Sequence, residues 1–302
     1  MLIKEYVDMD DAYKKFNLGL FLNDRYELIQ GATAHIYNCV IVMHSHQCSL
    51  DLSDFNYTDR KWTQLLQKYW DPYQFAMMIR RLRHYTRPDN KRSKRMVVDC
   101  AMHFKDRTNV SGACLLAISI GYKNNHWVAT VHARASELTV RWAADLIFVN
   151  RTIETVKDLL EIEEDFEVVW HVDSAYQSIT SIPYVLCRWG GIEEELNDRQ
   201  AEKYCHWGKS ICNRYHRSYV TGDWQNYSVQ KRPITAYQNW RDGVELPKIH
   251  CEISVDIKLL DTKIRELNLL DKKLYEFDEA NDIISTEISQ CIFGNSTPSL
   301  QF

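Results

Sequence analysis

The stretch Cys114-Leu-Leu-Ala-Ile-Ser-Ile-Gly-Tyr-Lys-Asn-Asn-His-Trp-Val-Ala-Thr-Val-His-Ala133 decides the fold. Two runs in it, 114–122 and 126–133, are rich in β-branched and aromatic residues and predict strands. The intervening Tyr122-Lys-Asn-Asn125 has turn chemistry, so the two strands are predicted to form a hairpin. Residues 137–160 follow with apolar positions near a period of 3.6, which predicts a long helix.

The same criteria extend the prediction outward from this segment. They predict further helices at 2–22, 61–69, 72–85, 191–206 and 258–277, and further strands at 35–43, 95–103, 166–171 and 252–257. The mixed order of elements predicts an α/β or α+β fold with one large sheet covered by helices on one face. We expect a catalytic domain over residues 1–257, followed by an amphipathic helix and tail over 258–302.

Composition excludes several classes of protein. The 302 residues carry 37 Lys+Arg and 41 Asp+Glu, a formal net charge of −4, which argues against a nucleic-acid partner bound by charge alone. No apolar run approaches the roughly 18–20 residues of a membrane span, so no membrane partner is expected. Residues 1–14 are acidic and lack the basic-then-apolar order of a signal peptide.

The chain contains nine cysteines, an odd number at irregular spacings, which favours free thiols in a reducing, cytoplasmic compartment. Zinc-type ligands occur at His44-Ser-His-Gln-Cys48 and around Cys205 and Cys212, but neither group has paired Cys-x-x-Cys knuckles, and we expect no metal. The aromatic and basic stretch 207–240 could stack on single-stranded bases, although packed loops are the favoured interpretation.

Three features in the middle of the chain are candidates for a binding or catalytic site. Lys94 and Arg95 open a predicted buried strand, Cys114 begins the hairpin, and Arg134 lies where the second hairpin strand meets the long helix. A cation beside a helix amino end favours anion binding, through the arginine fork and unpaired backbone N–H groups. A thiol near arginines is expected to have a lowered pKa. Together they suggest covalent catalysis on a phosphorylated small molecule; a structural thiol among surface ion pairs is the alternative.

The spacing of these residues sharpens the hypothesis. Cys114 follows Arg95 by 19 residues, Arg134 follows Cys114 by 20, and Asp145 follows Arg134 by 11. These intervals resemble those of the thymidylate synthase superfamily, which includes the deoxycytidylate hydroxymethylases. The resemblance covers residues 94–176, and Asn23-Asp-Arg25 and Trp170-His-Val-Asp-Ser-Ala-Tyr176 are similar to two further family segments.

The resemblance implies a three-layer fold around a large twisted mixed sheet, an obligate homodimer with shared active sites, and the cofactor 5,10-methylenetetrahydrofolate. Cys114 would add to C6 of a pyrimidine nucleoside monophosphate, and C5 would then attack the one-carbon unit. The other implied roles are base recognition by Asp145, phosphate binding by Arg134, Arg25 and Ser136, phosphate binding in the other subunit by Lys94 and Arg95, and sugar binding by Tyr176 and Ser174.

Two positions bear on the reaction. In the family, aspartate at the position of Asp145 goes with cytosine, because its hydrogen-bond pattern suits the N3/N4 edge. Gln64 stands where the family has a glutamate in an early helix, and a glutamine cannot do carboxylate acid–base work, so either Asp59 serves or the reaction is altered. Ala135 and Glu137 replace the serine and aspartate of the family's Arg-Ser-x-Asp motif.

The sequence therefore predicts a cytidylate hydroxymethylase first, with a methylase acting on dCMP or dUMP as the near alternative. Such enzymes are often encoded by viruses that modify their DNA, which would put the activity in the host cytoplasm. A relative of this fold that binds nucleotide or nucleic acid without catalysis is the competing class, supported by Gln64 and by the unmatched residues 190–302.

Overall fold

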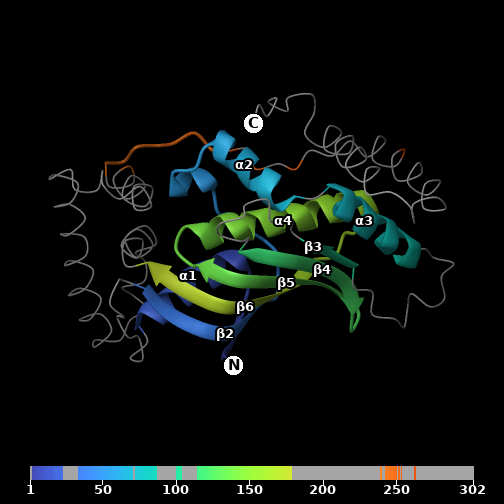
Figure 1. The fold of residues 1–302 in the computed structure, drawn as a ribbon, viewed down its shortest axis with the longest axis horizontal. Helices are drawn as coiled ribbons and strands as arrows, with labels where there is room; N and C mark the ends of the chain where they lie inside the picture. The colour runs from blue at the N-terminus through green and yellow to red at the C-terminus, as the bar shows by residue number, and fades with distance from the viewer. Residues whose placement is uncertain are drawn as a thin grey trace, which may run out of the picture.

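The computed structural model describes residues 2–22, 33–70, 72–86, 100–103 and 114–178, together with 239, 242–249, 251, 253 and 262. These residues form one mixed six-stranded sheet accompanied by helices, which confirms the predicted mixed α/β (α+β) class (Figure 1). The helix predicted at 191–206 lies outside the described residues, as do all but residue 253 of the strand at 252–257 and all but residue 262 of the helix at 258–277.

The strands run in the order β1-β2-β6-β5-β4-β3 across the sheet. Their bounds are Leu2–Tyr6 (β1), Thr33–Met43 (β2), Cys100–His103 (β3), Leu115–Lys123 (β4), His126–Glu137 (β5) and Phe166–Ser178 (β6). The pairs β1–β2 and β5–β6 are parallel, whereas β2–β6, β4–β5 and β3–β4 are antiparallel. The start of β4 and the ends of β5 and β6 therefore share one edge of the sheet, and the candidate site is at that edge.

The helices lie in two layers above this sheet. They are α1 (Met9–Leu22), α2 (Asp59–Tyr69), α3 (Pro72–Thr86) and α4 (Arg141–Leu160), with a short 3-10 turn, η1, at Leu52–Phe55. Helix α4 packs on the sheet through Trp142, whose ring centroid is 6.1 Å from that of Trp170 on β6. Helix α2 packs on the outer side of α4, with 5.5 Å between the Tyr69 and Phe148 centroids (Figure 1). The long helix is buried because it lies between β5–β6 and α2.

The hairpin between β4 and β5 is confirmed. Lys123 pairs with His126, and the two residues between them, Asn124 (φ 50°) and Asn125 (φ 65°), have left-handed backbone. A two-residue turn needs positive φ at both central positions to match the twist of its strands, and asparagine adopts this conformation readily.

The prediction of helix from residue 2 is wrong. Leu2–Tyr6 is a strand that pairs in parallel with Cys39–Met43, and the helix begins only at Met9. The Asp8 side chain accepts a hydrogen bond from the Asp11 backbone N–H (2.8 Å), as an N-cap residue does. Pairing with a distant strand overrides local helical periodicity here. The long helix likewise begins at Arg141 rather than at Glu137, which belongs to β5.

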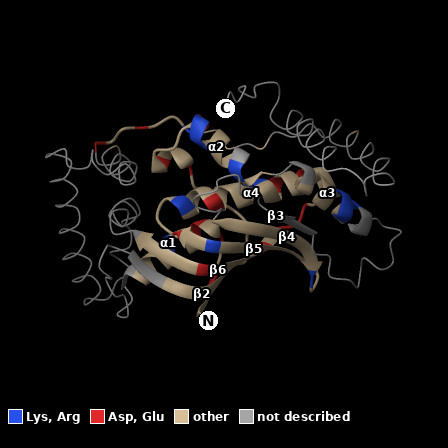
Figure 2. Cartoon of the chain, in the orientation of Figure 1, with Lys and Arg blue, Asp and Glu red and all other residues tan. Residues whose placement is uncertain are grey.

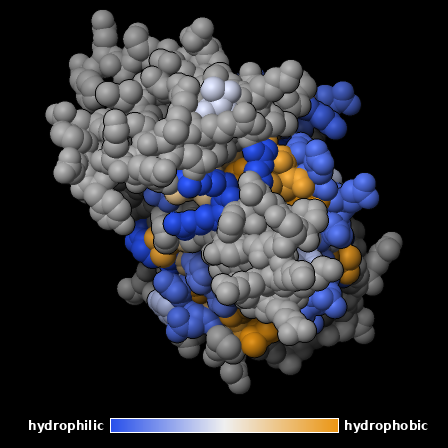
Figure 3. Space-filling view, turned by 90° about the vertical axis from the view of Figure 1, so that its right-hand side faces the viewer, coloured by the Kyte–Doolittle hydropathy of each residue, from blue (hydrophilic) through white to orange (hydrophobic). Residues whose placement is uncertain are grey.

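Charge is distributed over the described surface in small groups of both signs. Basic and acidic residues lie next to each other at the amino end of α4 (Figure 2). On the face nearest α3 and the β4–β5 turn, hydrophilic described residues alternate with small apolar areas (Figure 3). Within the described part of the chain, no helix is long and apolar enough to cross a membrane.

Candidate functional site

Cys114 and Arg134 lie side by side at the common edge of β4 and β5. The Arg134 backbone N–H donates to the Cys114 carbonyl (2.9 Å), one step beyond the Leu115–Ala133 strand pair. The Cys114 side chain is half-buried and the Arg134 side chain is exposed. Two residues predicted from their spacing are therefore brought together by the pairing of their strands.

Glu137 fixes the connection from β5 to α4. Its carboxylate accepts from the backbone N–H groups of Thr139 (3.1 Å), Val140 (3.0 Å) and Arg141 (3.1 Å), and also from the Thr139 hydroxyl. The first N–H group of α4, that of Arg141, and the two N–H groups immediately before the helix are thus occupied from within the chain. Glu137 thereby occupies part of the helix end at which an anion is expected, and it places a negative charge there.

The connection is also held from α1 and β6. Asn17 donates to the Leu138 carbonyl (2.8 Å), and the Tyr13 hydroxyl donates to the Thr139 carbonyl. On the other side, the Leu138 N–H donates to the Tyr176 carbonyl (2.8 Å). These bonds fix the residues just before α4, and Asp145 lies one helical turn after Arg141, the first residue of that helix.

Asp145 is a buried carboxyl with an altered proton affinity. Its side chain is 3% exposed, and burial raises its pKa to about 7. A hydrogen bond from the Tyr69 hydroxyl and the charges of Lys68 and Arg141 oppose this rise, whereas the charge of Glu137 adds to it. A carboxyl that titrates near neutrality can accept or donate a hydrogen bond at physiological pH, and such groups are frequent at functional sites.

The ionisation of Cys114 differs from the expectation. Burial and the neighbouring charge of Asp145 raise the pKa of the thiol, and Lys68, Arg141 and Arg134 lower it by less. The predicted lowering is therefore wrong for the described structure. The arginines are present, but partial burial beside an acidic side chain disfavours the thiolate more strongly than they favour it.

Tyr176 completes the group from the end of β6. It pairs with Glu137 in the sheet and its side chain is half-buried. Burial raises the pKa of its hydroxyl; Arg141 and Arg134 lower it, while Glu137 and Cys114 raise it. Cys114, Arg134, Asp145 and Tyr176 are thus close enough to affect one another's charge or that of shared neighbours, and they come from β4, β5, α4 and β6.

Two predicted residues lie near this group in the sheet. Ser136 is 1% exposed, and its hydroxyl oxygen has no hydrogen-bond partner among the described residues. Ser174 is half-buried on β6, pairs with Ala135, and is two residues before Tyr176, so both side chains project from the same side of the strand. An unpaired buried hydroxyl is uncommon. Ser136 pairs with Ala175, whereas Glu137 pairs with Tyr176, so the Ser136 side chain projects from the other face of the sheet.

The other predicted residues are not brought to the group. Gln64 is exposed on α2, and the alternative Asp59 is exposed at the first position of the same helix. Arg25, Lys94 and Arg95 lie outside the described residues.

Lys68 and Tyr69 were not predicted from the sequence, and Arg141 was considered only as a charge partner of Asp145. The burial of Tyr69 against Phe148 depends on the packing of α2 on α4, which no local pattern records. Arg141 had a usable signal, because it lies four residues before Asp145 and so shares its face of the helix.

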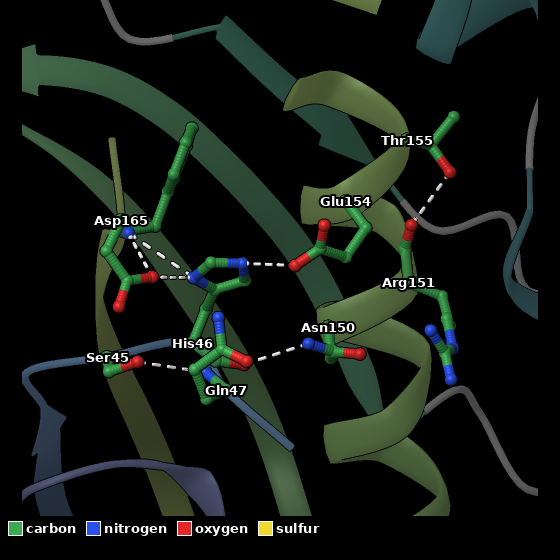
Figure 4. Close-up of polar contacts among 9 residues, drawn as sticks. Ser45, His46, Gln47, Asn150, Arg151, Glu154, Thr155 and Asp165 are labelled. Atoms are coloured by element: carbon green, nitrogen blue, oxygen red, sulfur yellow. Dashed lines mark hydrogen bonds and ion pairs between the residues drawn. The ribbon is translucent and has the colours of Figure 1, made fainter. Parts of the chain in front are cut away.

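A second polar cluster surrounds His46, which is fully buried after β2 (Figure 4). Its Nε2 lies 2.5 Å from Glu154 Oε1 on α4, and its Nδ1 contacts Asp165 Oδ1 at the start of β6. The Phe166 backbone N–H also lies 3.4 Å from Nδ1, so both ring nitrogens have polar partners within the chain. Burial raises the pKa of Asp165, but hydrogen bonds from Ser45 and the Phe166 N–H, together with His46, bring it below its usual value.

The His46 cluster ties three elements together and uses both ring nitrogens internally. It is therefore a group of polar contacts with a structural role, which joins the end of β2 to α4 and to the start of β6. Among the residues that the structure describes, no group of three or more His, Cys, Asp or Glu side chains is arranged to hold a metal ion. Cys205, His206 and Cys212 lie outside those residues.

No model of a protein family matches the chain, and a search of curated proteins found no similar protein. Inference about the chemistry of this site therefore rests on the residues described above.

Proposed function

We propose that the protein binds a pyrimidine nucleoside monophosphate, with cytidylate (dCMP or CMP) as first choice, and activates C5 of the base for one-carbon transfer. The preferred product is the 5-hydroxymethyl nucleotide. The observation that carries the proposal is the meeting of Cys114, Arg134, Asp145 and Tyr176 at one edge of the sheet. These residues are far apart in the sequence, and their types match the needs of a phosphorylated pyrimidine.

Cys114 is the nucleophile in this proposal. Its thiolate attacks C6, a sulfur–C6 bond forms, and the electron pair of the C5=C6 double bond makes C5 nucleophilic. After an electrophile or a solvent proton has added to C5, the original C5 hydrogen leaves as a proton. The electron pair then re-forms C5=C6 as the sulfur departs. Exchange of the C5 hydrogen with water therefore reports the nucleotide half of the reaction alone.

Asp145 selects the base. As a carboxylate it accepts from the cytosine N4 amino group, and as a carboxylic acid it donates to N3; with a pKa of about 7 both forms are accessible. Uracil presents an N3–H donor and an O4 acceptor in reversed order, for which an asparagine amide is the better match. A buried group left unpaired by the wrong base costs binding energy, which supports cytosine as the preferred base.

Arg134 and Arg141 are the described groups suited to the phosphate, with the Ser136 hydroxyl as a further donor. A guanidinium can make two parallel hydrogen bonds to a phosphate. Tyr176, at the end of the neighbouring strand β6, is suited to the sugar, with Ser174 beside it. A homodimer in which Lys94 and Arg95 reach the phosphate of the other subunit, and Arg25 that of its own, is part of the same proposal.

The one-carbon donor expected from the resemblance is 5,10-methylenetetrahydrofolate. A pterin ring presents N–H donors that a carboxylate would receive, and Glu137, the second buried carboxylate beside the site, already accepts from Thr139, Val140 and Arg141. The described residues do not fit this cofactor at Glu137. The mechanism proposed for the described residues is therefore limited to the nucleotide.

Release of tritium from C5-labelled nucleotides tests the proposal. The wild-type protein should release label from dCMP or CMP into water faster than from dUMP, and Cys114→Ser should abolish release. Cys48→Ser, which changes a half-buried thiol elsewhere in the chain, is the matched control and should retain it. Asp145→Asn should shift the preference toward dUMP.

The outcomes separate the alternatives. Faster release from dUMP than from dCMP by the wild-type protein would favour a methylase that acts on dUMP over a cytidylate hydroxymethylase. Binding of dCMP in calorimetry without release of label from any nucleotide would overturn the catalytic proposal in favour of a nucleotide-binding relative of the fold. Release that survives Cys114→Ser would overturn the assigned nucleophile.

A further inference from the structure

The end of α2 is fixed against the candidate site. Tyr69 is 4% exposed, and its ring centroid lies 5.5 Å from that of Phe148 on α4. Trp70, the residue that ends the helix, packs on the same ring with 6.3 Å between centroids. These two contacts hold the last turn of α2 over the first turns of α4, where Arg141 and Asp145 lie.

Lys68 is in that last turn and is half-buried. Its ammonium lies 5.4 Å from the centroid of the Tyr69 ring, a distance at which a cation is attracted to an aromatic face. The hydroxyl of the same ring donates to Asp145. The ammonium is thus near enough to Asp145 and Cys114 for its charge to act on both.

The charged and titratable groups around Cys114 come from four elements: Lys68 and Tyr69 from α2, Arg134 from β5, Arg141 and Asp145 from α4, and Tyr176 from β6. Among the cations, Lys68 opposes the raised pKa of the thiol more than either arginine does. Asp145 acts in the opposite direction, because its negative charge disfavours a neighbouring thiolate.

We infer that Lys68 is a further functional residue of this site, a positioning cation that stabilises the Cys114 thiolate against the opposing charge of Asp145. The inference deepens the proposed function and rests on the role of Cys114 as nucleophile. Helix α2, which was expected to contribute Gln64, contributes Lys68 and Tyr69 one turn later. When a bound base keeps Asp145 in its neutral form, Asp145 no longer disfavours the Cys114 thiolate. The charge of Lys68 would then favour the thiolate without that opposition.

The rate at which iodoacetamide alkylates Cys114 tests this inference, because the thiolate is the reactive form. The rate is followed by mass spectrometry of the peptide that contains Cys114, from pH 6 to pH 10 and without nucleotide. Lys68→Met should slow alkylation at pH 8 about three- to tenfold and move the pH profile upward, since a tenfold change in thiolate fraction corresponds to about one pKa unit. Lys68→Arg should restore the rate to within about twofold, because it keeps the charge.

Two further variants complete the test. Lys61→Met removes an exposed cation from the same helix and should leave the profile unchanged. Asp145→Asn should speed alkylation. An unchanged profile for Lys68→Met, or an equal slowing by Lys61→Met, would overturn the inference. Alkylation requires no nucleotide, so its result is read separately from tritium release. An unchanged alkylation profile would remove the role of Lys68 alone, whereas absent tritium release would remove the proposed reaction.

Discussion

Replacement of Asp145 by asparagine should stabilise the folded protein, by an amount that grows as the pH rises. Burial raises the pKa of this carboxyl from 3.8 to about 7. The folded state therefore keeps a proton that the unfolded chain has lost, and the stabilisation from this proton is complete below the unfolded value. It is lost as the pH rises through about 7, where the folded protein must bury a charge.

The magnitude follows from the same values. The rise in pKa corresponds to about 4 kcal/mol of unfolding free energy, at about 1.4 kcal/mol for each tenfold change in proton affinity. Asparagine has a similar shape and no charge, but its amide carries N–H groups that need partners, at a cost of about 1 kcal/mol. The variant should therefore be about 3 kcal/mol more stable than wild type at pH 8, and less than about 1 kcal/mol more stable at pH 5.

Urea denaturation between pH 5 and pH 8, followed by tryptophan fluorescence, measures this difference. Trp142 and Trp170 are fully buried, so their emission should report the unfolding transition. Asp158→Asn changes an exposed carboxylate of the same helix, and it should alter stability by less than about 0.5 kcal/mol. Equal stability of Asp145→Asn and wild type at pH 8, or a difference independent of pH, would refute the reasoning.

Three further changes test the supports of the site. His46→Ala should cost about 2–3 kcal/mol in urea denaturation, because two partly hydrated carboxylates lose their shared partner and a buried ring is removed; a cost below about 1 kcal/mol would contradict this. Glu137→Ala should cost about 2 kcal/mol and speed hydrogen exchange at the first amides of α4, whereas Glu137→Gln, which keeps one acceptor oxygen, should cost less. Tyr69→Phe should raise the pKa of Asp145 further, because the lost hydrogen bond favoured the carboxylate, and should move the pH dependence of stability upward. An unchanged or lowered transition in Tyr69→Phe would show that this hydrogen bond is not made.

The elements with strong local signals were predictable. The β4–β5 hairpin follows from two β-rich runs around a pair of asparagines, and α4 follows from its period. Leu2–Tyr6 carries no comparable signal, because what makes it a strand is its pairing with a segment more than thirty residues away. Asp8 did mark the true start of α1, as an N-cap residue.

The residues of the site also fall into those that could be predicted from the sequence and those that could not. Cys114, Arg134 and Asp145 were singled out by their spacing, and strand pairing together with the β5–α4 connection brings them together. Lys68 and Tyr69 could not be found, since they reach the site only through the packing of α2 on α4. The direction in which the Cys114 pKa shifts could not be predicted from the sequence either. It depends on how far the thiol is buried, which the number of nearby arginines does not indicate.

The Glu137 carboxylate at the amino end of α4 affects how charge is distributed at this site when a nucleotide is bound. Because Glu137 takes the Arg141 N–H and places a negative charge at this helix end, side chains are better suited to hold a phosphate, and Arg134 and Arg141 are the described cations available for it. A phosphate dianion would neutralise those two charges at the moment when Cys114 has to ionise. Of the three described cations that favour the thiolate, Lys68 would then be the one left to do so. We therefore expect the two arginines to bind the phosphate and Lys68 to stabilise the sulfur as a thiolate.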